Sequence, residues 1–217
     1  MNGPAPAIVP LGEAAITVRL GESASVESAE HSAALAVTIR GEALDGVTDV
    51  VAAVASVTVY FDTAGVREVA RIAIEQLVAH SGGPGTAARV VATHTIPTRY
   101  DGPDLDEVAE RVALPRDEVV RRHSGREYHV LAIGFLPCWG YLGMLYESLS
   151  LPRRPSPRTR VPAGSVGIMG TQTGIYPRVS PGGWNLIGST DITLFEASRT
   201  PPSLFRTGDR VRFARVD

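Results

Sequence analysis

The sequence predicts an α+β fold with two domains: a ferredoxin-like N-terminal domain and then a small β-barrel or compact sandwich. Two observations carry this prediction. Residues 14–96 follow the order β-α-β-β-α-β, which is the split β-α-β unit. After residue 133, Gly and Pro become nearly twice as dense, which is typical of short strands joined by tight turns. A length of 217 residues with 44% hydrophobic residues suits one or two domains.

The first domain, residues 1–92, begins with a strand over 14–20. Ser25 is a favourable N-cap for the next helix, because its hydroxyl can accept a backbone N–H of the first turn, and Gly41 ends that helix. Apolar residues at helical spacing predict its buried face: Val26, Ala29, Ala33 and Val37.

Two strands, 47–53 and 56–61, precede a second amphipathic helix and a last strand over 89–96. We expect this last strand to complete the sheet, with both helices covering one face. The predicted buried face of the second helix is Val66, Val69, Ala70, Ala73 and Leu77.

The second domain, residues 93–217, opens with two short helices. Asp104 and Glu107 have the spacing of a capping box, and Pro115 suits the first position of a helix that reaches His123. Apolar segments cut by Pro and Gly then predict a closed barrel or sandwich: 128–134, 166–169, 184–188, 193–195 and 211–213.

Composition excludes several chemistries. All 21 basic residues are arginine, so the chain cannot carry a Walker A loop, a lysine Schiff base or a Ser-Lys pair. A net charge of −2 argues against nucleic acid or a membrane as partner. One cysteine forbids an internal disulfide, and the five histidines lack metal-ligand spacing, so we expect no metal. No signal peptide is visible, so we expect a cytoplasmic protein.

Several local motifs keep two interpretations. The glycine-rich stretch 164–174 provides either bends of a tight barrel or close backbone approach to a ligand. Ser165 lies in an approximate Gly-x-Ser-x-Gly pattern but lacks the strand-to-helix context of a nucleophile. Cys138 has no base near it in sequence. The arginines within 153–160 form either a solvated loop or an anion clamp.

Three strings resemble the family of the B subunit of bacterial 5-oxoprolinase, also called allophanate hydrolase subunit 1 or the KipI family: residues 127–143, 152–177 and 180–188. The resemblance implies a ferredoxin-like N-terminal domain and a cyclophilin-like β-barrel, as in the carboxyltransferase subdomains C and D of urea carboxylase. The sequence departs from the family pattern at Cys138, where glycine is usual, and at Met169, where alanine is usual.

The same resemblance implies an activity, the ATP-dependent opening of 5-oxo-L-proline to L-glutamate. The partners would be the C subunit of 5-oxoprolinase, a protein similar to allophanate hydrolase subunit 2, and the A subunit. ATP with magnesium would act at the level of the complex, with no cofactor tightly bound in this chain, which we expect to be inactive alone. The alternatives are a KipI-like regulator that binds a sensor histidine kinase, and a member of a urea- or allophanate-processing carboxyltransferase complex with a biotin-carrying partner.

Residue chemistry and motif position together suggest three groups of site residues. His123, Glu127 and Gln172 are the catalytic candidates, the first two for proton transfer. The candidates for binding the small amide substrate or an anion are Arg158, Arg160, Thr173 and Tyr176. A hydrophobic string is expected to form a groove or a partner surface: Phe135, Leu136, Trp139, Tyr141 and Trp184.

Overall fold

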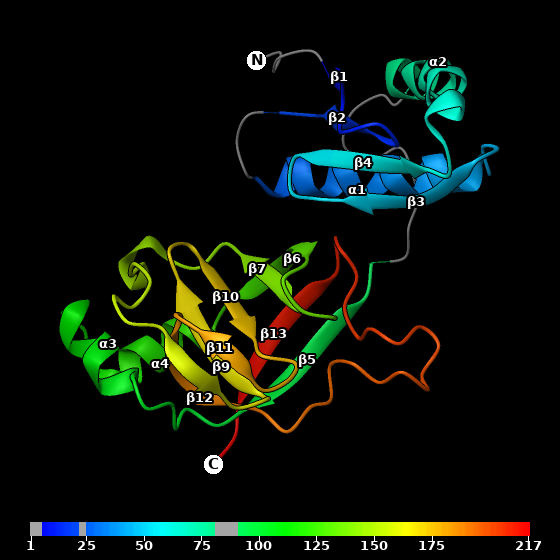
Figure 1. Ribbon diagram of the computed structural model, residues 1–217. Coiled ribbons are helices and arrows are strands. Elements are labelled where there is room, and N and C mark those ends of the chain that lie inside the picture. The colour runs from blue at the N-terminus through cyan, green and yellow to red at the C-terminus, as the bar shows by residue number, and fades with distance from the viewer. Residues whose placement is uncertain (1–5, 22–24, 81–90) are drawn as a thin grey trace. The chain divides into compact units, whose positions relative to one another are not determined.

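The computed structural model describes residues 6–21, 25–80 and 91–217, and it divides into two compact units, 1–90 and 91–217 (Figure 1). The elements of the first unit are β1 Ala7–Pro10, β2 Ala15–Arg19, α1 Val26–Gly41, β3 Val47–Ala52, β4 Ser56–Phe61 and α2 Ala64–His80. The helices and the first four strands of the second unit are β5 Thr93–Thr98, α3 Leu105–Arg111, α4 Arg116–Ser124, β6 Glu127–Ile133, β7 Gly140–Gly143, a 3₁₀ turn Glu147–Leu149 and β8 Arg158–Val161. The remaining strands are β9 Ser165–Met169, β10 Gln172–Ile175, β11 Ser180–Gly182, β12 Asn185–Ser189 and β13 Arg210–Arg215.

The first unit has two layers, an antiparallel sheet in the order β1-β2-β4-β3 and two helices that pack on it and on each other. The prediction that a last strand over 89–96 completes this sheet was wrong. Residues 89 and 90 lie outside the described residues, and 93–98 form β5, which pairs with β13 of the second unit. The edge beside β2 is instead taken by β1, a strand that was not predicted from the sequence.

The two helices were placed correctly, but their buried faces were only partly correct. Ser25 caps α1 as predicted, with its hydroxyl accepting the backbone N–H of Ser28 at 3.1 Å. Val37 of α1 and Val69 of α2 are 40% and 74% exposed, so neither belongs to the core. Ala and Val occur on several faces of each helix, so their spacing alone does not identify the buried face. The residues that α1 and α2 bury are Ala29, Ser32, Leu35, Ala36, Ile39, Ala70 and Ile74.

The second unit is a nearly closed barrel. Its seven-stranded sheet runs in the order β12-β9-β10-β7-β6-β13-β5. The edge strands meet where Arg99 and Ser189 exchange two backbone hydrogen bonds of 2.9 and 2.8 Å. A Cβ atom on Gly188 would lie 2.4 Å from the carbonyl oxygen of Arg99, so only glycine permits this approach. The predicted barrel is therefore confirmed in its general form.

Two further predictions in the second unit were wrong. The carboxylate of Asp104 makes no capping hydrogen bond to α3, because it binds arginine side chains and the backbone N–H of Leu186 instead. Residues 193–195 form no strand and contribute only an isolated bridge between Phe195 and Ser203. Four strands of this unit were also not predicted from the sequence: β7, β8, β10 and β11. In the described part of the chain, no helix is long and apolar enough to cross a membrane.

Candidate functional site

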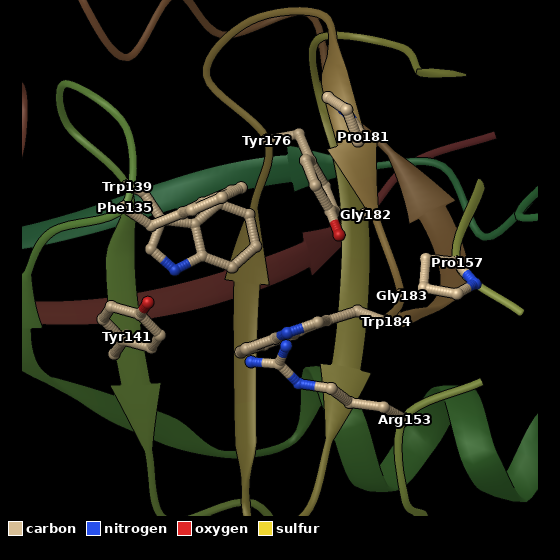
Figure 2. A pocket seen from close by; sticks show the side chains of 10 residues that line it. All are labelled: Phe135, Trp139, Tyr141, Arg153, Pro157, Tyr176, Pro181, Gly182, Gly183 and Trp184. Carbon is tan, nitrogen blue, oxygen red and sulfur yellow. The ribbon is translucent and has the colours of Figure 1, made fainter. Parts of the chain in front are cut away.

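An aromatic pocket of about 230 Å³ lies on the outer face of the barrel sheet. Side chains alternate along a strand, so Leu142 and Ile187 enter the barrel core while Tyr141 and Leu186 belong to a second, smaller cluster on the other face. Figure 2 shows the side chains that line the pocket: Phe135, Trp139, Tyr141, Arg153, Pro157, Tyr176, Pro181, Gly182, Gly183 and Trp184.

The pocket walls are aromatic rings in edge-to-face contact around Trp139. The centroid of its ring lies 5.0 Å from that of Trp184 at 90° and 4.6 Å from that of Tyr176 at 69°. Tyr141 and Phe135 contact the same indole at 6.0 and 5.7 Å. Such geometry adds about 0.5–1.5 kcal/mol per pair beyond burial, so the walls are held rigidly.

Glycines of the sheet make room for these rings. A Cβ atom on Gly174 would lie 2.9 Å from Cζ2 of Trp139, and one on Gly167 would lie 3.1 Å from Cβ of Trp184. Gly164 and Gly170 have φ values of +78° and +54°, which are the turn positions of the same stretch. The glycine-rich segment therefore provides both the bends of the barrel and the flat floor on which the indoles lie.

Replacing Gly174 with alanine should displace the indole of Trp139. An overpacked contact of this kind costs about 1–3 kcal/mol, so we expect a loss of unfolding free energy and a changed tryptophan emission. Denaturation followed by fluorescence measures both. Gly183→Ala is the matched control, because its Cβ atom would meet only Pro157 at 3.6 Å. Equal effects of the two substitutions would contradict this role of Gly174.

Two polar groups of the pocket have no partner among the described residues. The indole Nε1–H of Trp139 is buried and makes no hydrogen bond. Arg153 is exposed and forms no ion pair within the described chain, and Figure 2 shows its side chain extending toward the ring of Trp184. Tyr176 is buried, which raises the pKa of its hydroxyl, while a backbone hydrogen bond from Trp184 opposes that rise. The pocket therefore presents one positive charge, that of Arg153, while the unpaired indole N–H of Trp139 lies buried beneath its surface.

The loop over the pocket carries backbone strain. Phe135 and Cys138 have φ values of +62° and +64°, in the left-handed region that costs a non-glycine residue about 1–3 kcal/mol. Phe135 is 61% exposed at the rim, whereas Cys138 is buried with its Sγ atom 2.9 Å from the hydroxyl of Ser203. A left-handed backbone of this kind favours glycine, so Cys138 is held there at a conformational cost.

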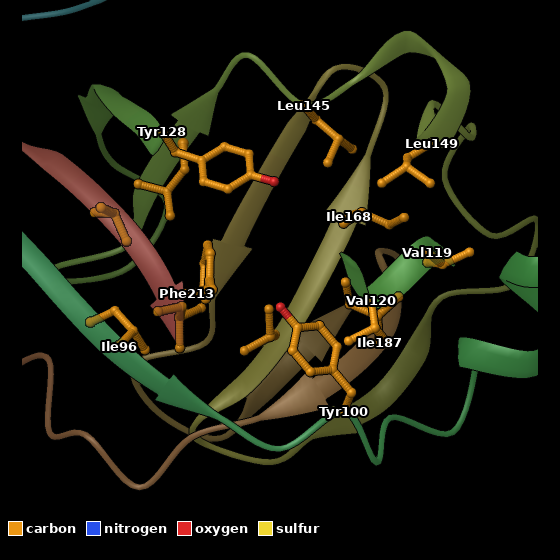
Figure 3. Packing of buried hydrophobic residues seen from close by; sticks show 14 of the residues in the cluster. Ile96, Tyr100, Val119, Val120, Tyr128, Leu145, Leu149, Ile168, Ile187 and Phe213 are labelled. Atoms are coloured by element: carbon orange, nitrogen blue, oxygen red, sulfur yellow. The ribbon is translucent and has the colours of Figure 1, made fainter. Parts of the chain in front are cut away.

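His123 and Thr173 lie inside the barrel and not in the pocket. The Nδ1 atom of His123 is 2.8 Å from the Tyr100 hydroxyl, and its Nε2 atom is 2.9 Å from the Thr173 hydroxyl, which donates to the carbonyl of Gly167. Figure 3 shows Tyr100 within this packed interior. Burial lowers the pKa of His123 to about 3, so the ring is neutral. These contacts give His123 a packing role inside the barrel, away from the aromatic pocket.

Glu127 and Arg158 are engaged in ion pairs. Glu127 accepts hydrogen bonds from Arg210 at 2.8 Å and Arg212 at 2.9 Å, and the first of these is the main reason that its pKa is lowered. Both terminal guanidinium nitrogens of Arg158, Nη1 and Nη2, donate to the carboxylate of Asp104. Both side chains therefore already have partners, which disfavours proton transfer by Glu127 and a free anion clamp at Arg158.

The structure brings together the aromatic candidates and separates the others. Tyr176 lies in the pocket with the aromatic residues predicted for a groove, and Leu136 packs beside them. Arg160 is exposed on β8, and Gln172 is half-buried at the start of β10. Arg153 was not predicted as a pocket residue, although it belongs to the arginine cluster that was singled out. Proline-rich spacing does not show which arginine of an extended segment faces a pocket.

A nearly closed barrel with a small aromatic pocket and a single charged lining residue makes this chain an α+β protein with a candidate ligand pocket. The chain belongs to the family described as carboxyltransferase domain, subdomain C and D, whose model matches residues 6–205.

Relatives support this assignment along the chain. A Bacillus subtilis protein named as the B subunit of 5-oxoprolinase is 37% identical over 95% of this chain and 91% of its own length. A solved structure titled TTHA0988 has a TM-score of 0.83 and 38% identity, and covers 94% of this chain. This chain spans only 40% of that longer one. The Kluyveromyces lactis urea carboxylase shares the fold, with a TM-score of 0.76 at 18% identity over 98% of this chain and 22% of its own.

Proposed function

We propose that this chain is the B subunit of an ATP-dependent 5-oxoprolinase, which opens 5-oxo-L-proline to L-glutamate. The observation that carries the proposal is the match to a protein of that name over nearly the full length of both chains. In this proposal the first unit is ferredoxin-like, with β1 in the place of the usual last strand, and the barrel is cyclophilin-like.

The pocket suggests that the chain does not act alone. Its ten lining residues include aromatic rings and an arginine but no carboxylate, histidine or cysteine. Amide activation by ATP needs a phosphate-binding site and groups that move protons. We therefore propose that the C and A subunits of 5-oxoprolinase complete the site, and that ATP with magnesium acts at the level of the complex.

Two of the predicted residues remain proposed contacts in such a composite site. Arg160 is exposed and forms no ion pair within the described residues, so its guanidinium is available to a phosphate or carboxylate. Gln172 lies two residues before Gly174 on β10, so it shares the outer face on which the pocket lies. Its amide can both donate to and accept from a lactam.

ADP release with and without 5-oxo-L-proline tests the proposal. The chain is measured alone, then with the C subunit, and then with both the C and A subunits. We expect turnover that requires 5-oxo-L-proline and all three chains. A stable complex without stimulation by 5-oxo-L-proline would overturn the proposal and favour a urea-like amide or a kinase-regulatory role.

A further inference from the structure

We infer that a basic cavity at the end of α4 binds a phosphate group, either free phosphate or that of a small monoester. The cavity measures about 250 Å³ and is lined by Arg121, Arg122, Gly125 and Tyr146. Arg126 lies beside it, with its Cζ atom 4.3 Å from the centroid of the Tyr146 ring. The basic cavity shares no lining residue with the aromatic pocket, and its ligand is independent of the proposed function.

The arginines of the basic cavity retain donors that the protein does not use. Glu118 accepts from Nε and Nη2 of Arg121 and from Nε of Arg122. Ser148 accepts from Nη1 of Arg122. Within the described part of the chain, Nη1 of Arg121 and Nη2 of Arg122 make no hydrogen bond, and the half-buried Arg126 makes none at all. A guanidinium only donates, so these groups require acceptors from outside the chain.

The basic cavity keeps a net positive charge. Hydrogen bonds from Arg121 and then from Arg122 lower the pKa of Glu118 to about 2, so Glu118 is ionised at neutral pH. Its carboxylate offsets one of the three guanidinium charges and leaves two. Contact with the ring of Tyr146 holds Arg126 in place but offsets none of its charge. A doubly charged anion therefore matches the cavity in charge.

The end of α4 does not by itself explain these arginines. Cations in the last turn of a helix commonly balance its unpaired carbonyls and its dipole. Here the carbonyls of Val120, Arg121 and His123 already accept hydrogen bonds of 2.8–2.9 Å from other groups of the chain. The unused guanidinium donors are therefore available to a ligand.

A well-held turn places Tyr146 beside the arginines. Buried Leu145 donates its backbone N–H to the carbonyl of Thr171 at 2.9 Å, and buried Leu149 donates to the carbonyl of Tyr146 at 2.8 Å. Met144, just before this turn, has a φ of +79° and is 43% exposed. Such a backbone is costly for a residue other than glycine, and strain of this kind clusters at ligand sites. The cavity is therefore preformed, which reduces the cost of binding.

Phosphate suits the basic cavity better than a carboxylate does. A phosphate monoester carries about 1.5 to 2 negative charges at pH 7 and three strong acceptor oxygens, so it can accept from several guanidinium groups at once. A carboxylate has one charge and two oxygens, which suffice for a single guanidinium. Pockets for drug-sized molecules measure about 300–1,000 Å³. A cavity of about 250 Å³ therefore takes the phosphate with at most a small attached body.

Calorimetric titration of the full chain with inorganic phosphate tests the site. A salt concentration of about 0.15 M screens long-range attraction. We expect one phosphate per chain, with a Kd of about 1 mM or below. In an amide ¹H–¹⁵N spectrum, the signal of Gly125 should shift saturably, whereas that of Gly183, in the aromatic pocket, should not. Titration with methyl phosphate separates the two sources: equal or tighter binding indicates a monoester, and weaker binding indicates free phosphate.

Arg126→Gln is the main variant, because Arg126 makes no contact with Glu118 and its loss leaves the ion pairs of α4 intact. It should raise the Kd for phosphate about tenfold or more, since a charged hydrogen bond is lost. Arg126→Lys keeps the charge but not the planar fork, so it should raise the Kd by less. Arg178→Gln is the matched control, since Arg178 is exposed on the same unit but does not line the cavity, and we expect it to leave the Kd unchanged.

Three results would overturn the inference. The first is an equal Kd for the wild type and Arg126→Gln. The second is equal weakening by Arg126→Gln and Arg178→Gln, which would indicate attraction by overall charge alone. The third is acetate that binds as tightly as phosphate, which would favour an acidic segment of a partner protein. Should Arg126→Gln prove unstable, Arg126→Lys carries the test, because its cation can still contact the ring of Tyr146.

Discussion

Lowering the pH from 7 to 5 is expected to remove about 2 kcal/mol of unfolding free energy through His123 alone. Burial lowers the pKa of this ring to about 3 in the folded chain, against 6.5 for an unperturbed histidine. Between pH 6.5 and 3, the unfolded chain therefore binds a proton at His123 that the folded chain does not bind. Stability is full above pH 6.5 and falls by up to about 1.4 kcal/mol per pH unit as the pH drops toward 3.

Hydrogen bonds explain why this ring remains neutral. Thr173 donates its hydroxyl proton to the carbonyl of Gly167, so its oxygen accepts from Nε2 of His123. The hydroxyl of Tyr100 then donates to Nδ1. Each polar group in this series is satisfied with one proton on the ring, and a second proton would point at a donor.

Urea denaturation at pH 7, 6 and 5 measures the effect, with His123→Gln as the test variant. We expect the variant to be less stable at pH 7, because it disturbs the buried hydrogen bonds, but to depend less steeply on pH. His80→Gln, at the exposed end of α2, should retain the wild-type slope. A His123→Gln slope equal to that of the wild type would contradict this explanation.

Asp104→Ala is expected to cost about 3 kcal/mol of unfolding free energy, because it leaves Arg158 and the buried N–H of Leu186 without their acceptor and removes one of the two carboxylates that bind Arg154. The carboxylate is 3% exposed and binds Arg158 at 2.6 Å, Arg154 at 2.9 Å and the N–H of Leu186 at 2.7 Å. These contacts fix the segment that carries Arg153 and the pocket residue Pro157.

Asp106→Ala is the control for Asp104→Ala. Both carboxylates lie at the start of α3 and both bind an arginine, but Asp106 is 79% exposed. A solvated pair contributes about 0–1 kcal/mol, so the control should be nearly neutral. Thermal or urea denaturation of the two variants makes the comparison. Equal losses would show that burial of Asp104 does not determine its contribution.

Local signals in the sequence predicted most elements but not all of their partners. The Ser25 cap, the helix after Pro115 and the strands at 47–52 and 56–61 follow from capping and alternation, which depend on neighbouring residues. The assignment of 89–96 failed because a strand's own residues do not show which sheet it joins. The short strands β8 and β11 escaped because Pro and Arg hide their alternation.

In the candidate site, too, residue types were predicted better than their positions in the fold. The aromatic string around Trp139 predicted a groove because its residue types are conspicuous. His123 and Thr173 seemed suited to chemistry, but their positions on α4 and β10 point them into the barrel. Asp104 was predicted as a cap, since its partners Arg154 and Arg158 lie far along the chain. Long-range ion pairs leave no periodic trace in a sequence.

The parallel pairing of β5 with β13 determines the order in which the chain can mature during synthesis. β5 is the first strand of the barrel, and its partner β13 is made only after residues 99–209, whereas the strands in the described part of the first unit all end before residue 62. At roughly 5–20 residues per second, that interval lasts on the order of ten seconds. During this interval the edge of β5 that later pairs with β13 is exposed on the nascent chain. An exposed strand edge can pair with another chain, so aggregation is a risk until the barrel closes.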